Sequence, residues 1–257
     1  MVFFDRTSYY YVMVNSTLTR KEREYLHREQ LILDTARNIL ATDGYQMFSM
    51  ERIASEIEYS KGTIYNHFKS KEDILSSLCC DSLEALSLLF ERAKDYDACS
   101  RDKISALILA YALHAKLRPV DVQNMQSIKS QVVREKVSQP LSEKMDLAEQ
   151  KVIEPAKEIV MYAIHQGDLQ IESEEAAGEM ITGMWSLGYG TFLLSQTQID
   201  FNSLGLALPE KQFLNNAQKL LDGYHWKPLS NKVKLEEYYL KIGKEVFPEE
   251  FKTIKTM

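Results

Sequence analysis

The segment from Ser49 to Phe68 holds the residue types best suited to contacting nucleic acid. Its second half carries hydroxyl, ammonium and amide side chains, which donate to and accept from base edges and phosphate oxygens. Its apolar residues recur at helical spacing in two short runs. Two short helices joined by a tight turn allow one helix to enter the DNA major groove while the other braces it. The segment therefore predicts a helix-turn-helix that binds DNA.

Individual residues of this segment have distinct expected roles. Gly62 removes a side chain where the backbone must approach DNA closely, and a helix N-terminus near Ser60 favours a phosphate. Ser49, at the start of the bracing helix, is placed to donate to phosphate. The predicted contacts on these grounds are Ser49, Ser60, Lys61, Gly62, Thr63, Tyr65 and Asn66.

The charge of the chain argues against DNA binding only when it is taken globally. The formal net charge is −6 and the pI is about 5.5, whereas phosphate contact requires local positive charge. From Ser60 to Lys71 there are three lysines and one histidine and no acidic residue. The acidic residues lie mostly elsewhere, so the net charge does not exclude a nucleic-acid partner.

The composition predicts an all-α protein. A chain of 257 residues with 45% hydrophobic and 26% charged residues is ordinary for a folded protein, and only 10 glycines and 6 prolines favour helices. No apolar run is long enough for a membrane span, and the first residues lack the apolar run of a signal peptide. Three cysteines, Cys79, Cys80 and Cys99, indicate free thiols in a reducing compartment. We therefore expect a cytoplasmic protein without a membrane partner.

Helix signals that position the DNA-contacting segment surround it on both sides. Thr19 and Glu22 form a capping box for a helix that should end at Gly44. Ser49 and Ser60 are expected N-caps of the next two helices. Longer helices are expected at 70–94, 101–117, 121–138, 140–166 with a kink or split at Pro155, 173–196 and 209–223, and one weaker helix in 229–257.

Residues 26–86 resemble the DNA-binding domain of TetR-family transcriptional regulators. The resemblance rests on Ile32–Gly44, on Ser49–Ile57 and above all on Ser60–Phe68 followed by Lys69-Ser-Lys-Glu72. It implies a homodimer that binds a palindromic operator and releases it when a small molecule occupies the C-terminal domain. It also implies that Tyr65, His67 and Lys71 contact the phosphate backbone, and that Asn66 varies with the operator.

One residue departs from the family pattern in the turn of the helix-turn-helix. The family usually has glycine where this chain has Glu58. If Glu58 adopts a left-handed conformation, it should cost about 1 kcal/mol relative to glycine. Its carboxylate also places negative charge near the DNA-facing turn, so we expect lower affinity and an intact fold.

The expected organisation has four segments. Residues 1–25 form an N-terminal arm and the start of the first helix, and 26–86 form the three-helix DNA-binding domain with its helix-turn-helix at 49–68. Residues 87–225 form a larger helical domain for ligand binding and dimerisation, and 226–257 form a helical extension. The helices at 173–196 and 209–223 are the expected homodimer face, because the first is more apolar than one exposed helix should be. The alternative is that it is a buried central helix.

Methionine, aromatic and histidine residues of the larger domain are candidates for a pocket that binds the unknown effector. Methionine and aromatic side chains adapt to irregular apolar ligands, although each residue taken singly is more often ordinary core. The candidates are Tyr111, His114, Met125, Met161, His165, Met184, Trp185 and Tyr189.

Catalysis and metal binding have no support in the sequence. The histidines and cysteines lack the spacing of metal ligands, and no nucleophile elbow, phosphate loop or carboxylate pair is present. We therefore predict no enzymatic activity, no metal and no cofactor. Two alternatives to a ligand-responsive repressor stay open. One is an architectural or cell-cycle factor whose C-terminal domain binds a protein, and the other is a helical enzyme with a look-alike N-terminus.

Overall fold

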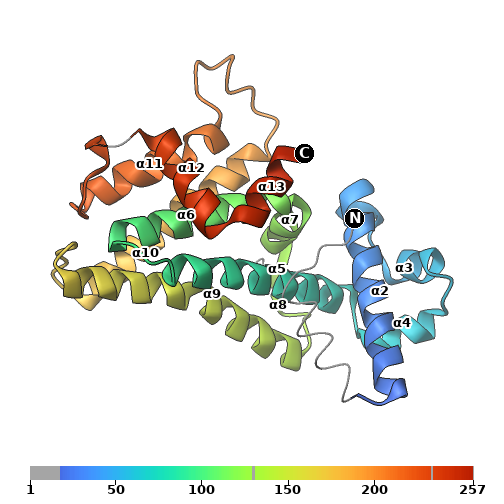
Figure 1. Cartoon of the computed structure of the whole chain (residues 1–257). Coiled ribbons are helices and arrows are strands. Elements are labelled where there is room, and N and C mark those ends of the chain that lie inside the picture. Colours follow the sequence, from blue (N-terminus) through green and yellow to red (C-terminus); the bar gives the residue numbers. More distant parts are fainter. Residues whose placement is uncertain (1–17, 129–130, 233, 257) are drawn as a thin grey trace. The chain divides into compact units, whose positions relative to one another are not determined.

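The computed structural model describes residues 18–128, 131–232 and 234–256, and all regular structure in these residues is helical (Figure 1). The all-α prediction is confirmed. Most of the predicted N-terminal arm lies outside the described residues. None of the helices described is long and apolar enough to cross a membrane.

The chain folds as two compact units. The N-terminal unit contains the residues up to Leu78 together with Asn124–Ser142, and the C-terminal unit contains Cys79–Gln123 and the residues from Glu143 onward. One helix, α5 (Lys71–Lys94), contributes to both.

The N-terminal unit is built on α2 (Arg20–Thr42), which begins at the predicted capping box. Thr19 Oγ1 accepts a hydrogen bond from the Glu22 amide at 3.3 Å, and Glu22 Oε2 accepts one from the Thr19 amide at 2.7 Å. The chain leaves the helix at Gly44, which has φ of 75°. Short helices α3 (Met50–Glu56) and α4 (Lys61–His67) follow, and α3 packs on both α2 and α4 (Figure 1).

A small apolar core holds these helices together. It contains apolar side chains at helical spacing, which are at most 7% exposed, and each one removes apolar surface from water. The core residues of α2, α3 and α4 are Ile32, Leu33, Ala36, Ile39, Leu40, Met50, Ile53, Ala54 and Ile64. The start of α5 joins this unit through Asp73, whose Oδ1 accepts from the Ser138 amide at 2.8 Å.

The C-terminal unit surrounds α6 (Ser100–Leu117), whose side chains are buried on most sides. Helices α10, α11, α12 and α13 all contact α6. The longest helix, α9, runs through Pro155 as one helix, so of the kink or split predicted at this proline the split does not occur. The bounds of the remaining helices are α7 Pro119–Ile128, α8 Gln131–Arg134, α9 Gln139–Gln166, α10 Glu174–Ser195, α11 Pro209–Gly223, α12 Leu235–Val246 and α13 Pro248–Thr256.

The tail has two α-helices where the sequence predicts one. Pro248 begins α13, since proline lacks an amide hydrogen and fits the first position of a helix but not its interior. The tail is fixed to the body by Arg92, whose guanidinium pairs with Glu250 at 2.7 Å and also donates to the Val246 carbonyl.

A buried arginine connects α6 to α11 and to the segment that follows it. Arg101 is 2% exposed and pairs with Asp222 at 2.6 Å. It also donates to the Gln218 side chain and to the Trp226 carbonyl. A guanidinium in this position satisfies several acceptors from one rigid fork. The contact sets the distance between α6 and the chain after α11.

Candidate nucleic-acid interface

Serine caps fix both helices of the helix-turn-helix. Ser49 Oγ accepts from the Arg52 amide at 3.1 Å, and Ser60 Oγ accepts from the Thr63 amide at 3.1 Å. The N-cap predictions are confirmed. The Ser60 hydroxyl also lies 2.9 Å from Thr63 Oγ1, so the two hydroxyls that begin α4 form one hydrogen-bonded pair. Because the cap residues are held, the free backbone amides at the start of α4 have a fixed direction.

The turn between α3 and α4 contains the residue that departs from the family pattern. Glu58 has φ of 57°, so it adopts the left-handed conformation in which glycine is favoured. The chain closes the turn with a hydrogen bond of 3.0 Å from the Tyr59 amide to the Ala54 carbonyl. Glu58 is exposed, so its carboxylate lies in solvent at this turn.

The exposed face of α4 carries most of the predicted DNA contacts. Lys61, Gly62, Tyr65 and Asn66 are exposed, with Tyr65 at 43%, and Thr63 is half-buried. A tyrosine this exposed on a short helix presents its ring and hydroxyl to a partner. The face therefore combines one ammonium, one phenol and one amide, a set that reads phosphates and base edges.

An acidic residue that the sequence does not single out lies beside Lys61. Glu51 Oε1 of α3 is 2.9 Å from Lys61 Nζ, and both side chains are more than half exposed. The lysine ammonium lowers the pKa of the Glu51 carboxyl through this hydrogen bond. An exposed ion pair is worth at most about 1 kcal/mol, so Lys61 can leave Glu51 for a phosphate. The two residues are ten positions apart, and only the turn geometry brings them together.

His67 does not lie on the exposed face, which corrects its predicted role. Its side chain is 2% exposed and stacks on the Tyr25 ring of α2, with 4.0 Å between centroids. Burial lowers the pKa of His67, and Nδ1 has no hydrogen-bond partner among the described residues; the nearest carboxylate, Glu29, is 3.8 Å away. The ring therefore packs against α2 and supports α4 from its inner side.

Lys71 is half-buried at the start of α5, with its ammonium 4.9 Å from the centre of the Tyr45 ring. This cation–π contact holds the side chain in place. Three further residues near the helix-turn-helix are exposed and apolar or aromatic, and the sequence reasoning did not select them: Tyr45, Met47 and Tyr59.

Among the described side chains, Tyr111 and Tyr189 lie close together, and the other predicted effector residues are found at other places in the fold. Tyr111 lies in an aromatic cluster, with its ring centre 5.3 Å from that of Phe192 and 6.2 Å from that of Phe213. His114 is buried and lies 3.2 Å from the Ser82 hydroxyl of α5. Tyr111 and His114 are therefore packed in the core of the C-terminal unit.

The other candidates are spread over α7, α9 and α10. Met161 and His165 of α9 and Trp185 of α10 are exposed, so they do not line an enclosed pocket. Met184 and Tyr189 are half-buried on α10. Met125 belongs to α7, and its side chain lies outside the described residues.

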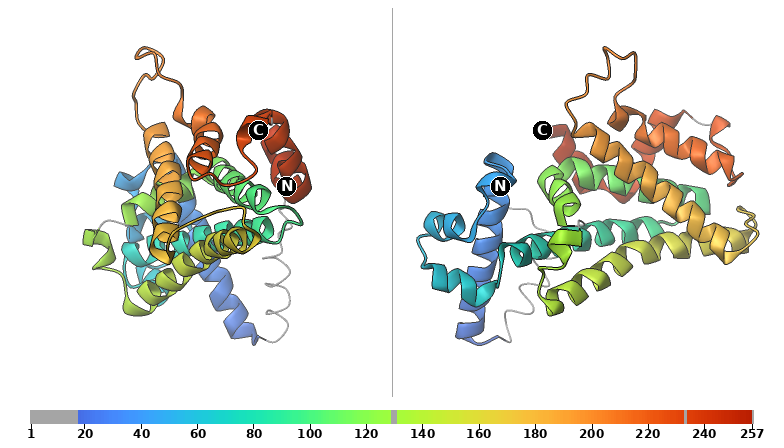
Figure 2. Two further views of the ribbon diagram at one scale, coloured as in Figure 1. Left: turned by 90° about the vertical axis from the view of Figure 1, so that its left-hand side faces the viewer. Right: turned by 180° about the vertical axis from the view of Figure 1, so that it is seen from behind.

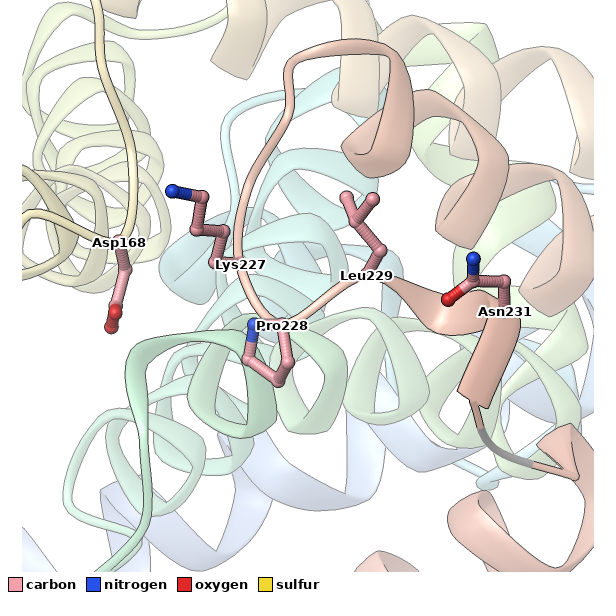
Figure 3. Close-up of a pocket in the computed structure, with 5 residues that line it drawn as sticks. All are labelled: Asp168, Lys227, Pro228, Leu229 and Asn231. Atoms are coloured by element: carbon pink, nitrogen blue, oxygen red, sulfur yellow. The ribbon is translucent and has the colours of Figure 1, made fainter.

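A hollow of about 460 Å³ lies at a different place in the C-terminal unit. Figure 3 shows it between the turn after α9 and the segment after α11. The turn residue Asp168 accepts from the Ser100 hydroxyl at 2.6 Å through Oδ2 and from the Lys227 amide at 2.8 Å through its carbonyl. The carboxylate and the carbonyl of Asp168 are thus both engaged in hydrogen bonds that stabilise the fold. The lining residues are Asp168, Lys227, Pro228, Leu229 and Asn231, none of which is a predicted ligand residue.

Several known proteins that are similar to this chain are bacterial transcriptional regulators. Residues 32–78 match the family described as bacterial regulatory proteins, tetR family. The fatty acid metabolism regulator protein of Bacillus subtilis is 32% identical over 77 residues, which are 30% of this chain and 40% of the relative. An HTH-type transcriptional regulator of Staphylococcus aureus is 30% identical over 95 residues, 37% of this chain and 51% of the relative. The match thus spans about half the length of these curated relatives or less.

Solved structures share the fold over a larger part of the chain. PfmR, a TetR family transcriptional regulator of Thermus thermophilus, has a TM-score of 0.58 at 18% identity and covers 74% of this chain and 97% of its own. The ketosteroid transcriptional regulator KstR2 of Mycobacterium tuberculosis has a TM-score of 0.56 at 16% identity, covering 76% and 94%. The relatives are named as regulators, in agreement with the prediction that the chain is not an enzyme. Residues 32–78 thus match the tetR family of bacterial regulatory proteins, and the helical fold of the chain is similar to that of solved TetR-family regulators.

Proposed function

We propose that the protein is a homodimeric repressor that binds a palindromic operator and releases it when a small molecule binds the C-terminal unit. The observation that carries the proposal is the exposed face of α4, where Lys61, Tyr65 and Asn66 stand beside a capped helix start. The proposed contacts are Ser49, Ser60, Lys61, Gly62, Thr63, Tyr65, Asn66 and Lys71.

The expected docking places α4 in the major groove with its N-terminus towards the backbone. Capped, unbonded amides at the start of a helix attract a phosphate, and the Lys61 ammonium adds a charge there. Tyr65 and Asn66 lie one turn further and are placed for phosphate and base contacts. Two such helices in a dimer must be about 34–36 Å apart, or farther with bending or wider operators, to enter successive major grooves.

The exposed side of α10 supports the homodimer. Trp185, Leu193 and Leu194 are large apolar residues that lie in solvent on one subunit. The exposed positions of α11 are polar or charged, including Lys211 and Lys219, so α10 supplies most of the apolar surface. Several large apolar residues exposed on one helix are a feature of interaction sites.

Release by a ligand requires only that the ligand prefer one spacing of the two reading helices. A difference in affinity of a few kcal/mol between two conformations is enough to empty the operator. The names of two relatives refer to fatty acid metabolism and to ketosteroids, which makes apolar carbonyl or carboxyl compounds the first class to test. Native mass spectrometry of the purified protein would identify a bound compound directly.

The reading helix is tested by DNA binding over a range of salt concentrations. A binding sequence is first selected from random duplex DNA, and affinities are then measured by fluorescence anisotropy. Lys61→Ala should weaken binding to all sequences and lower the slope of log affinity against log salt by about 1. Tyr65→Phe should weaken binding several-fold, since it removes one hydroxyl donor.

Lys241→Ala is the matched control, because it removes an exposed lysine from α12, outside both the proposed reading helix and the proposed dimer face. We expect this variant to bind as tightly as the wild type, with the same salt dependence. Unchanged affinity and salt slope in both Lys61→Ala and Tyr65→Phe would show that α4 is not the reading helix.

A further inference from the structure

The loop between α10 and α11 is unusually apolar for an exposed segment. From Thr182 to Leu208 the sequence contains one charged residue, Asp200. Within the loop, Leu204 is 63% and Leu206 54% exposed, and Ile199 is also exposed. Single exposed apolar residues are normal, but a set of them continuous with an apolar helix face is a feature of interaction surfaces.

The loop has a defined shape of its own. The Leu206 amide donates to the Phe201 carbonyl at 2.8 Å, and the Gly205 amide to the Asn202 carbonyl at 3.0 Å. Asp200 accepts from the Ser203 amide at 3.1 Å, so its carboxylate is used inside the turn. The loop is therefore preformed, and a partner does not have to order it on binding.

Figures 1 and 2 show the loop extending beyond the ends of α10 and α11, away from the other helices of its unit. It contains thirteen residues, Gln196–Leu208, between the two helices. With six residues out and six back, at no more than about 3.4 Å each, its reach is at most about 20 Å. A helix with side chains is about 10–12 Å across, so the loop is long enough to cross one helix of a neighbouring molecule.

We propose that this loop is a dimerisation arm that packs on the α10 face of a second copy of the chain. The proposal rests on the homodimer part of the proposed function and names the segment that each subunit contributes to its partner. Around a twofold axis, each arm covers the other subunit's helix, so both apolar surfaces are buried at once.

Two observations favour a second copy as the occupant. The arm follows Leu193 and Leu194 of α10 directly in the chain, so exposed apolar residues occur on both sides of the end of this helix. An interface between identical surfaces brings like charges together, and this surface is almost free of charge. The receiving helix also has room, because a Cβ added at Gly183 or Gly190 would meet nothing within 4 Å among the described residues.

The arm is tested by measuring the dimer dissociation constant of the full chain by sedimentation equilibrium. Leu204→Asp combined with Leu206→Asp should raise this constant at least tenfold, because two carboxylates would be buried against the partner helix. The control is Leu147→Asp on α9, which places the same change at a leucine that is 60% exposed and outside the proposed interface. It should change the constant less than twofold.

Three results would contradict the proposed role of the loop as a dimerisation arm. They also distinguish this role from dimerisation itself. If the double variant dimerises as tightly as the wild type while Trp185→Asp on α10 does not, the homodimer stands and the arm is wrong. If both variants dimerise normally, or if the wild type is monomeric at all concentrations, the homodimer through α10 fails together with the arm. DNA binding by α4 is judged separately, from Lys61→Ala.

A second measurement keeps the test decisive if the aspartate variant does not fold. Leu204→Ser with Leu206→Ser removes the apolar side chains without adding charge and should weaken the dimer in the same direction. A photoreactive phenylalanine analogue at the position of Leu204, in an isotope-labelled subunit mixed with unlabelled chain, should cross-link to α10 of the unlabelled copy. Cross-links confined to the labelled copy would contradict the proposal.

Discussion

Glu58 holds a backbone conformation that glycine adopts more readily, in the turn that orients the proposed reading helix. With φ of 57° it bears steric strain that glycine lacks, although glycine gives up more chain entropy on folding. We expect Glu58→Gly to raise the stability of the N-terminal unit by about 0.5–1 kcal/mol. Both tryptophans, Trp185 and Trp226, lie in the other unit, so amide hydrogen exchange in α3 and α4 is the suitable measurement.

Two controls separate backbone strain from charge at this position. Glu58→Gln keeps the strain and removes the carboxylate, so it should tighten DNA binding and leave hydrogen exchange unchanged. Glu56→Gly, two residues earlier in α3, should destabilise the helix by about 1 kcal/mol because its backbone is helical. Faster amide hydrogen exchange in Glu58→Gly than in the wild type would contradict the inference that the backbone at Glu58 is strained.

At the scale of the element, the start of α4 depends on one hydroxyl. Ser60→Ala removes the acceptor for the Thr63 amide and should cost about 1 kcal/mol, seen as faster hydrogen exchange at the start of α4. Ser60→Asp keeps a capping acceptor and should retain most of the stability. It should nevertheless weaken DNA binding strongly, because a carboxylate replaces the hydroxyl where a phosphate is proposed to lie. Equal loss of stability in both variants would show that the cap is not the cause.

The helices most accurately predicted are those whose ends carry their own signals. Thr19, Ser49 and Ser60 form the caps expected of them, because a cap is a contact between residues three positions apart. The structure differs from the prediction at two places: α9 is not split at Pro155, and the tail has a second helix. The first depends on packing, since a buried helix can accept a proline that would end an isolated one, whereas the second begins at a local signal, Pro248.

At the scale of the whole molecule, the stability of the C-terminal unit should depend on pH through His114. Burial, together with nearby Arg118, lowers the pKa of His114 to about 4. The unfolded chain, with an ordinary pKa near 6.5, therefore binds the proton first as the pH falls. We expect the free energy of unfolding to decrease between about pH 6.5 and pH 4 by up to about 3 kcal/mol, at roughly 1.4 kcal/mol per unit.

Tryptophan fluorescence during urea unfolding follows this unit, which contains both tryptophans. His114→Gln removes the titrating group and should lose less stability over the same pH range, although it will be less stable at pH 7 without the full contact to Ser82. An identical pH slope in the variant and the wild type would rule out His114 as the source.

The sequence alone determined the helical class, the helix-turn-helix and the face of α4 that carries Lys61, Tyr65 and Asn66. These features depend on local spacing and capping, which act within a few residues. Only the tertiary structure decided that His67 turns inward onto Tyr25, that Glu51 pairs with Lys61, and which of the predicted effector residues lie together. Such contacts join residues ten to more than forty positions apart, and no local pattern records which of them will meet when the helices pack.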